Sequence, residues 1–338
     1  MNIYTEAGWL DSCAIIDRAQ PFTFIIGGRG VGKTYGFLKE TIYTRGEKII
    51  YLRRTEQELE ICMNEEYSPF RKLNADLGRD VRICKEGKIY LIKEDDKVLG
   101  SAVALSTVQK IRGMSADDVN YIIFDEFIRE RNQRRTIKDE AGALFNLYET
   151  VNRNRELEGR PPVMCIALAN ANDLGNPFFI TLDLVRVMEK GQRKGKYPLI
   201  HCDNARGLLL IDLGPSSPVS AAKQETALYK LTRGGDYAAM ALKNEFSYNP
   251  KSRQASRPLK EYKPLVFVGE VGVYRHKSNG SMYVSLHQAG QAPRFEKNAV
   301  EIARFRKNFP WLYLAYLRDL LEFESYTAET LLTEYMTG

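Results

Sequence analysis

Residues 22–40, FTFIIGGRGVGKTYGFLKE, constrain the fold of this chain more than any other stretch. Five strand-forming residues lead into a glycine-rich segment, and an amphipathic helical pattern follows. The segment has the spacing GxxxxGK[ST], in which glycines let successive backbone N–H groups converge on a phosphate at the positive end of a helix. An incidental glycine-rich turn is the alternative, but the flanking strand and helix argue against it. We predict a phosphate-binding loop (P-loop) of Gly27, Gly28, Arg29, Gly30, Val31, Gly32, Lys33 and Thr34.

Two acidic residues follow the apolar run YIIF at 121–124 and complete the predicted site. A P-loop needs a second acid at the end of a neighbouring strand to finish the shell of a Mg²⁺ ion that also takes the Thr34 hydroxyl. Asp125 fits this metal position, and Glu126 fits a general base for the attacking water. Alone, the two acids could instead cap a helix. With the P-loop they predict Mg²⁺-dependent ATP hydrolysis, in which Lys33 reaches the β- and γ-phosphates.

One polar residue stands at the end of the next apolar run, VMCIALA. Asn170 follows this run directly. An amide at the end of the strand beside the acidic strand could touch both the γ-phosphate and the lytic water, and so report hydrolysis. An ordinary turn asparagine is the alternative. We predict that Asn170 belongs to the site.

Several arginines are candidates for the remaining positive charge. Arg153 and Arg155 lie at the end of a helical pattern, and Arg112 lies on a loop before the acidic strand. An arginine delivered by a neighbouring subunit accelerates phosphoryl transfer by roughly 10³–10⁵-fold. Exposed arginines are common, so each could also be an ordinary surface residue. Arg53 and Arg54 could sense nucleotide within the subunit or pair with the acidic segment EQELE that follows them.

The first two hundred residues alternate short apolar runs with helical patterns, which is typical of a mainly parallel sheet flanked by helices. A glutamate beside the metal acid, with a strand and a β-meander inserted before it, is typical of the additional-strand P-loop ATPases, by analogy of fold. We predict an α/β ATPase domain of this kind over 1–200. Its expected elements are strands at 22–26, 48–52, 120–124 and 163–169, a meander over 81–106 with turns at Gly87 and Asp95-Asp96, and helices at 33–45 and 137–152.

The residue composition and the pattern of predicted elements change after about residue 200. Segments rich in Pro, Ser and Lys surround one short helical patch and predict a linker region over 201–234. Two strands joined at Ser278-Asn279-Gly280, and the helical patterns WLYLAYLRDLLEF and AETLLTEYM, predict a smaller α+β domain over 235–338. From Arg186 to Lys260 there are 14 basic and 6 acidic residues. This zone suits a polyanion such as nucleic acid, although solvated surface lysines would give the same count.

Composition excludes several classes of protein. The 338 residues are 44% hydrophobic, and no run of about 18 apolar residues could span a membrane. The N-terminus lacks the pattern of a signal peptide. Five scattered cysteines and three histidines predict neither a disulfide framework nor a zinc site. We therefore expect a soluble cytoplasmic protein without a membrane partner.

Five motifs resemble those of a known family. FIIGGRGVGKTY, IIYLRR, IIFDEFIRE, ALFNLYETVNRNRE and IALANA, in this order and at this spacing, closely resemble the terminase-like DNA-packaging motor ATPase of small short-tailed phages with protein-primed genomes. The resemblance covers about residues 20–175. Many ATPases share the P-loop and the acidic pair, whereas FDEFIRE together with VNRNRE is specific.

The resemblance implies a homopentameric ring that hydrolyses ATP to push double-stranded DNA into the capsid. The ring would act in the host cytoplasm, at the portal vertex of the prohead, docked through a packaging RNA as in relatives. The resemblance also implies that Arg153 is an arginine finger acting in trans, that Arg155 is its neighbour, and that Arg112 holds a further basic position able to act in trans.

The C-terminal domain of the family resembles an RNase H-like nuclease without its catalytic acids. Here the strand PLVFVGEVGVY carries only Glu270, and one acid cannot hold two metal ions. Two alternatives stay open. A terminase-type enzyme with an active nuclease would cleave DNA with metal, and a nucleotide-gated assembly factor would bind ATP tightly and turn it over slowly, without response to DNA.

Overall fold

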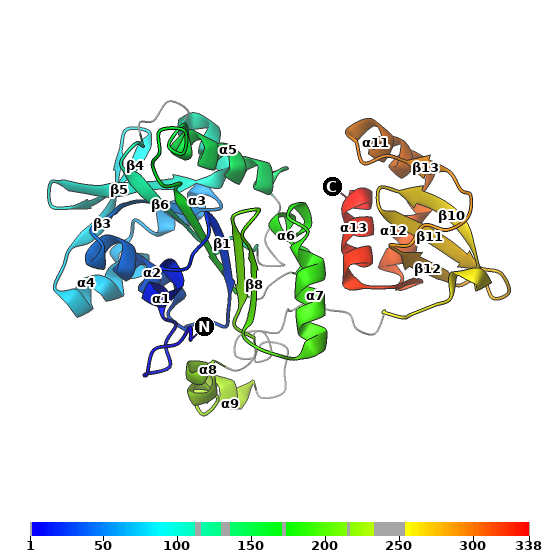
Figure 1. Ribbon diagram of the computed structural model, residues 1–338, viewed down its shortest axis with the longest axis horizontal. Coiled ribbons are helices and arrows are strands. Elements are labelled where there is room, and N and C mark those ends of the chain that lie inside the picture. Colours follow the sequence, from blue (N-terminus) through cyan, green and yellow to red (C-terminus); the bar gives the residue numbers. More distant parts are fainter. Residues whose placement is uncertain are drawn as a thin grey trace. The chain divides into compact units, whose positions relative to one another are not determined.

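The computed structural model describes residues 2–111, 116–129, 136–170, 174–214, 217–232 and 254–337. The chain divides into two compact units (Figure 1). The first unit is Met1–Asp173 with Gly191–Ser247, and the second unit is Leu174–Lys190 with Tyr248–Gly338. This division differs from the predicted one, in which an ATPase domain ended at 200 and a linker ran to 234. No helix in the described ranges is both long and apolar enough to cross a membrane.

The first unit is built on a mixed, mainly parallel sheet. Within the described residues its strand order is β3-β4-β5-β2-β6-β7-β1-β9-β8. The strands from β5 to β9 in this order run parallel to one another, and antiparallel pairs extend the sheet at both edges. The strands are β1 (Phe22–Ile26), β2 (Lys48–Arg53), β3 (Val81–Glu86), β4 (Ile89–Glu94), β5 (Lys97–Ala104), β6 (Val119–Asp125), β7 (Met164–Ala169), β8 (Leu199–Asp203) and β9 (Leu208–Asp212).

The central strands form where the sequence has continuous apolar runs. Strands with both faces buried read as unbroken apolar segments, and β1, β6, β7 and β9 are buried along most of their length. The four predicted strands and the β-meander are confirmed. The register places Asp125 level with Leu168, and Ile26 level with Ala169. The chain therefore leaves β1, β6 and β7 at one edge of the sheet.

Helices surround this sheet. The predicted helix at 33–45 is confirmed as α2 (Lys33–Leu38) continued by a π-helical turn, η1 (Lys39–Thr44), and Gly46 ends it at φ +67°. The predicted helix at 137–152 begins later, as α5 (Glu140–Asn152), because the Asp139 carboxylate accepts a hydrogen bond from Gly142 N at 2.8 Å and caps it. The others are α1 (Ser12–Ile16), α3 (Glu56–Ile61), η2 (Glu65–Tyr67), α4 (Arg71–Leu77), η3 (Leu105–Ile111), α8 (Pro218–Lys223) and α9 (Ala227–Leu231).

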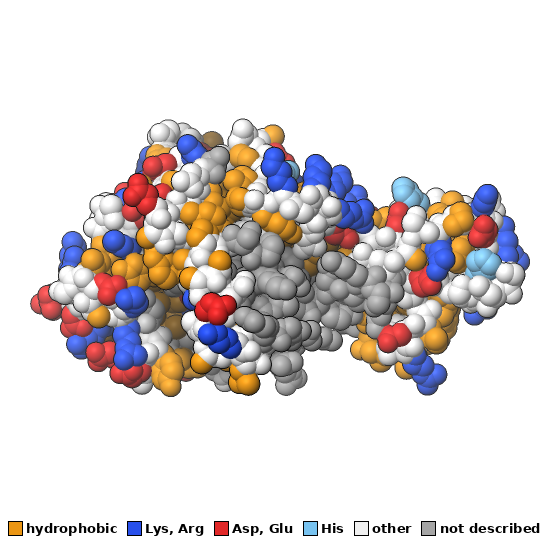
Figure 2. All heavy atoms as spheres, turned by 90° about the horizontal axis from the view of Figure 1, so that it is seen from below, with side chains coloured by type: hydrophobic (Ala, Val, Ile, Leu, Met, Phe, Trp, Pro, Cys, Tyr) orange, Lys and Arg blue, Asp and Glu red, His pale blue; other side chains and the backbone are white. Residues whose placement is uncertain are grey.

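The predicted linker at 201–234 contains part of the first unit instead. Strands β8 and β9 form an antiparallel pair, and β9 runs parallel to β1 in the sheet. The helix α8 occupies the Pro/Ser-rich segment that was expected to be a connection, and it begins at Pro218, a residue that suits the first helical turn. Figure 2 shows acidic and basic side chains interspersed over the first unit (left) on the face in view.

The second unit has a five-stranded sheet, counted over the described residues, in the order β13-β10-β11-β12-β14. Two strands were expected around Ser278-Asn279-Gly280, but the structure has three. The chain also turns at Gly269, at φ +50°, and this turn divides the first expected strand in two. The end of the pattern WLYLAYLRDLLEF is a strand rather than helix, since it pairs with β12. The elements are α6 (Pro177–Thr181), α7 (Leu184–Lys194), η5 (Leu259–Glu261), β10 (Tyr262–Val268), β11 (Val271–His276), β12 (Met282–Ser285), β13 (Arg294–Phe295), α11 (Ala299–Asn308), α12 (Pro310–Leu317), β14 (Leu321–Phe323) and α13 (Tyr326–Thr337). The helix α7 runs across the boundary between the units.

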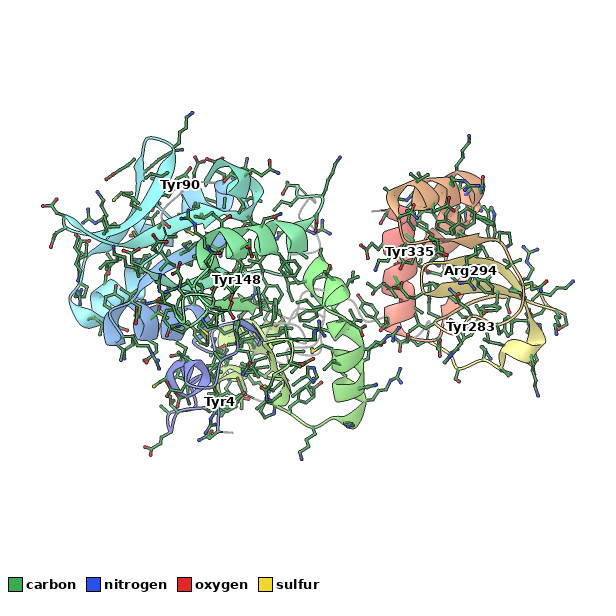
Figure 3. The ribbon with its side chains drawn as sticks, turned by 45° about the horizontal axis from the view of Figure 1, so that its top comes forward. Tyr4, Tyr90, Tyr148, Tyr283, Arg294 and Tyr335 are labelled. Atoms are coloured by element: carbon green, nitrogen blue, oxygen red, sulfur yellow. The ribbon has the colours of Figure 1, made fainter. Side chains whose placement is uncertain are left out.

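The two faces of the second sheet have different cores. Valines of β10, β11 and β12 pack with Phe305, Leu312 and Leu332 of the helices. On the other face, aromatic residues including Tyr283 cluster (Figure 3). The Arg294 guanidinium lies 5.0 Å from the centre of the Phe267 ring in this cluster. The helix prediction AETLLTEYM is confirmed as α13.

Candidate active site

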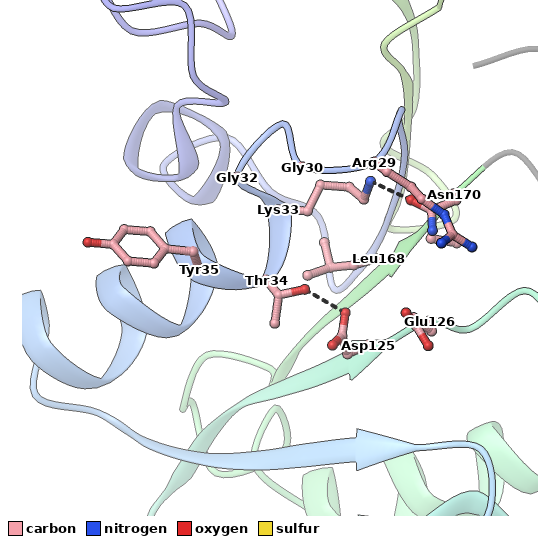
Figure 4. Close-up of a pocket in the computed structure, with 11 residues that line it drawn as sticks. Arg29, Gly30, Gly32, Lys33, Thr34, Tyr35, Asp125, Glu126, Leu168 and Asn170 are labelled. Carbon is pink, nitrogen blue, oxygen red and sulfur yellow. Dashed lines mark hydrogen bonds between the residues drawn. The ribbon is translucent and has the colours of Figure 1, made fainter. Parts of the chain in front are cut away.

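The P-loop joins β1 to α2 at the carboxyl edge of the parallel strands. Gly30 and Gly32 have φ values of +69° and +93°, a region that side chains disfavour, and Gly32 is the N-cap of α2. The loop borders a cavity of about 300 Å³ (Figure 4). Three predicted partners from other strands, Asp125, Glu126 and Asn170, line the same cavity. Lys33 and Asn170, which are 137 positions apart in the sequence, therefore share one site.

Lys33 is buried at the centre of this site. Its ammonium donates hydrogen bonds to the carbonyl oxygens of Gly27 and Gly28 at 2.7 and 2.9 Å, and to the Asn170 side-chain oxygen at 3.1 Å. The loop therefore curls around the tip of its own lysine. Asn170, chosen from sequence because it ends the strand beside the acidic strand, contacts this lysine directly (Figure 4).

The acidic strand β6 places Asp125 beside the hydroxyl of Thr34 in the helix α2. Thr34 Oγ1 donates to Asp125 Oδ1 at 2.7 Å, and the Tyr51 hydroxyl donates to Asp125 Oδ2 at 2.9 Å. Burial, followed by the charge of Asp125, raises the pKa of Tyr51 well above its ordinary value, so the hydroxyl keeps its proton and remains a donor. Sequence reasoning missed Tyr51, because an aromatic residue inside a buried strand reads as core.

Glu126 lies just beyond the end of β6 with a strained backbone. Its φ is +56°, and Phe127 N restores the pairing with β7 through a 3.1 Å hydrogen bond to Leu168 O. The Glu126 side chain is 58% exposed, and it pairs with Arg53 at 2.7 Å. Arg53 also reaches Asp125 at 3.3 Å, so one guanidinium bridges both predicted carboxylates.

Arg54 points away from the acidic pair that its neighbour Arg53 bridges. Its guanidinium donates to Glu140, the first residue of α5, at 2.7 Å. Each side chain of this pair is only 2% exposed. A charge left alone at such a site costs about 3–5 kcal/mol, so this pair fixes the start of α5 to the strand end that holds Arg53.

The structure separates Arg153 from Arg155. Arg153 ends α5, is 45% exposed, and lies 4.0 Å from Asp117, which precedes β6. Arg155 is buried and donates to Val119 O at 2.6 Å and to Asn120. Both arginines therefore lie at the amino end of β6, about 20 Å from its carboxyl end at roughly 3.3 Å per residue. Arg112 lies outside the described residues.

A lysine from a distant segment also contacts the P-loop. Lys223, at the end of α8, donates to the carbonyl oxygens of Arg29 and Gly30 at 2.9 and 3.2 Å. Nothing in the sequence pointed to Lys223, because it lies more than 190 residues from the loop in a segment that read as a connection.

The protonation of Lys33 gives a testable property of the site. Burial lowers the pKa of Lys33 to about 7, and the charges of Asp125 and Glu126 offset only part of this effect. A bound phosphate would raise the pKa again, because an opposite charge favours the ammonium form. Binding of ADP should therefore take up close to one proton per site at about pH 8.5, and about half of that near pH 7.

Calorimetric titration of ADP in buffers of different ionisation enthalpy measures this proton uptake. At pH 8.5 the phosphates of free ADP are already fully ionised, so the lysine is the expected source of the signal. Binding at pH 8.5 with no proton uptake would contradict the lowered pKa of Lys33 in the free site.

Comparison with known proteins places the chain in a family. The model of the podovirus DNA encapsidation protein (Gp16) matches residues 9–297. The DNA packaging protein of Bacillus phage phi29 is 32% identical over 267 residues, 77% of this chain and 74% of that protein. That of Bacillus phage B103 is 30% identical over 324 residues, 91% of this chain and 94% of that protein.

A solved structure agrees with these sequence matches. A chain of the bacteriophage phi29 viral genome packaging motor assembly superposes with a TM-score of 0.64 at 23% identity, over 99% of this chain and 100% of that chain. The likeness of fold extends through both units. Because the family match covers most of the chain and includes the P-loop and the acidic pair, the protein belongs to the podovirus DNA encapsidation (Gp16) family and is a phage DNA packaging motor ATPase.

Proposed function

We propose that this packaging ATPase works as a homomeric ring, a pentamer as the motif resemblance implies, which couples Mg²⁺-dependent ATP hydrolysis to translocation of double-stranded DNA into the prohead. The observation that carries the proposal is the convergence of Lys33, Thr34, Asp125, Glu126 and Asn170 on one cavity at the carboxyl edge of β1, β6 and β7. Contacts to DNA phosphates are independent of sequence, which suits a translocase that must move along any sequence.

The P-loop would hold the phosphates of ATP. Its backbone N–H groups and Lys33 bind the β- and γ-phosphates. Thr34 Oγ1 and Asp125 Oδ1 lie 2.7 Å apart, and a hydroxyl with a carboxylate is the oxygen donor set that Mg²⁺ prefers, so these residues fit a magnesium site. The ion, when bound, would neutralise charge on the phosphate oxygens. Tyr51 orients Asp125 for this role.

Glu126 is proposed as the general base. Its carboxylate takes a proton from water as the water oxygen forms a bond to the γ-phosphorus, and the bond to ADP breaks. Arg53 holds Glu126 at the cavity and balances its charge. Asn170 contacts Lys33, so it lies where it could detect the loss of the γ-phosphate.

Arg153 is proposed as the arginine finger, acting on the site of a neighbouring subunit. It is exposed, and it lies at the amino end of β6, opposite to the end that holds its own P-loop site, which suits action in trans. Arg155 is engaged with the backbone at the start of β6, so we assign it a structural role and leave it out of the catalytic set. Arg112 remains proposed as a second trans residue on the basis of the family resemblance alone.

The second unit is proposed to be an RNase H-like domain that docks to the portal and to a packaging RNA and does not cut DNA. Glu270 accepts a hydrogen bond from Tyr335 and lies 3.9 Å from Lys297. Burial opposes its ionisation, but these two partners, a backbone hydrogen bond and the charge of Arg186 together outweigh it and lower the pKa of Glu270. Among the described residues, no three of His, Cys, Asp and Glu are placed to share a metal ion. The engagement of Glu270 with Tyr335 and Lys297 supports a domain without nuclease chemistry.

Steady-state ATP hydrolysis, measured with and without double-stranded DNA across a range of protein concentrations, tests the proposal. A translocating ring should turn over faster as it assembles and when DNA is present. Turnover that is slow and indifferent to both would favour the nucleotide-gated assembly factor. Metal-dependent cleavage of plasmid DNA by the same preparation would favour a terminase with an active nuclease.

A further inference from the structure

The P-loop is held from outside by a residue that belongs to neither ATPase motif. Lys33 binds the carbonyl oxygens of Gly27 and Gly28, and Lys223 of α8 binds those of Arg29 and Gly30, at 2.9 and 3.2 Å. Two ammonium groups therefore hold four successive carbonyl oxygens of the loop.

The next carbonyl of the loop is also engaged. The N-terminal segment supplies Leu10 N, which donates to Val31 O at 3.1 Å. The ring of Trp9, which is 48% exposed, would be 3.5 Å from a Cβ placed on Gly32. Each carbonyl oxygen from Gly27 to Val31 thus has a donor, and only the first two donors come from a lysine that the motif itself provides.

These contacts determine the direction of the loop's N–H groups. In a trans peptide the C=O and the following N–H point in opposite directions. When Lys223 fixes the carbonyls of Arg29 and Gly30, it also fixes the N–H groups of Gly30 and Val31 on the other side of the loop. The ammonium lies where a Cβ on Gly30 would be, so a side chain at this position would displace Lys223 Nζ from the loop.

We propose that Lys223 is a positioning residue for nucleotide binding, which holds the P-loop backbone in the conformation that presents its N–H groups to phosphate. This inference rests on the proposed role of the loop and extends it to a helix that follows the last strand of the sheet. Lys223 adds a positive charge on the outside of the loop, close enough for its charge to act on Lys33. The same contact ties α8 to the nucleotide site, so nucleotide occupancy and the position of α8 are linked.

The loss of these two bonds should weaken nucleotide binding and leave the chemical step intact. We expect Lys223→Met to raise the Kd for ADP by roughly 10–100-fold, as the loss of charge-assisted hydrogen bonds does. The KM for ATP should rise with it, while kcat at saturating ATP should stay near the wild-type value, because Lys223 contacts no reacting atom. Lys223→Arg keeps a charged donor and should recover much of the affinity.

ADP titration by calorimetry on the full chain tests the inference. Lys230→Met is the matched control, because Lys230 lies on the neighbouring helix α9, is 57% exposed, and pairs with Glu225 at 3.4 Å. A second readout is Trp9 fluorescence in a Trp311→Phe background, which leaves Trp9, beside the P-loop, as the single tryptophan of the chain. Thermal unfolding without nucleotide establishes that each variant is folded.

The outcomes separate the inference from the function it rests on. Weaker ADP binding by folded Lys223→Met, recovery by Lys223→Arg and no change in Lys230→Met support it. Wild-type ADP affinity in Lys223→Met, with binding abolished in Lys33→Ala, overturns the role of Lys223 and leaves the P-loop assignment intact. If Lys33→Ala also binds normally, the P-loop assignment itself fails. If Lys223→Met does not fold, equal affinity of Lys223→Arg and a folded Lys223→Gln, which lacks the charge, overturns the inference.

Discussion

Assembled rings in which every subunit carries Arg153→Ala should hydrolyse ATP roughly 10³–10⁵-fold more slowly than wild-type rings, as expected when an arginine acting in trans is removed. Arg153 ends α5 and is 45% exposed, so its removal should leave the fold intact. Binding of ADP should be unchanged, because the P-loop of the same subunit lies at the other end of β6. Hydrolysis at saturating ATP and calorimetric ADP titration measure the two effects.

Mixing the variant into wild-type protein shows whether Arg153 acts between subunits. Activity should fall faster than the mutant fraction rises, because each altered subunit disables a neighbour's site. Arg160→Ala is the control, since Arg160 is a neighbouring, 39% exposed arginine that also contacts Asp117. Wild-type turnover in assembled Arg153→Ala rings, or an equal loss in Arg160→Ala, would count against the finger.

Glu126→Gln should bind ATP and fail to hydrolyse it, with a loss of roughly 10²–10⁴-fold in kcat, the usual contribution of a general base. Glutamine has nearly the same size and can still accept a hydrogen bond from Arg53, but it cannot take a proton from water. The affinity for ATP should stay within a few-fold of the wild-type value, because Lys33 and the P-loop N–H groups are untouched. Stopped turnover with retained ATP binding is the expected pair of results.

A second glutamate provides the control for this prediction. Glu58 lies 3.9 Å from the same arginine, Arg53, and forms a capping box with Thr55 at the start of α3. A glutamine serves equally well in a capping box, so Glu58→Gln should keep most of the turnover. The base assignment fails if Glu126→Gln hydrolyses ATP normally, or if it loses ATP binding as Lys33→Ala is expected to do.

Local patterns in the sequence were sufficient to predict which residues meet at the core of the site. The strands β1, β6 and β7 are continuous apolar runs, and each ends where its motif begins. Parallel strands place their carboxyl ends at one edge of the sheet. Lys33, Asp125 and Asn170 therefore had to meet if β1, β7 and β6 lay side by side in this order. The sheet has that order: β7 separates β1 from β6.

Contacts between distant segments could not be read from the sequence. Arg153 and Arg155 look alike in the sequence, as arginines two residues apart. In the fold, Arg155 is buried and donates to Val119 O, whereas Arg153 is exposed. No local sequence pattern predicted the contact of Lys223 with the P-loop. The strand β14 resembled the end of a helix, but tertiary pairing with β12 outweighed the helical pattern once α12 had ended at Leu317.

The backbone at Glu126 and Arg153 sets a limit on how far this protein could be stabilised. Both residues have positive φ, +56° and +44°, where a glycine would relieve a strain of the order of 1–3 kcal/mol. A selection for thermal stability alone would favour glycine at both positions and would remove the proposed base and the proposed finger together. The most durable versions of this motor would then be inactive ones, and natural selection for packaging must keep both positions less stable than they could be.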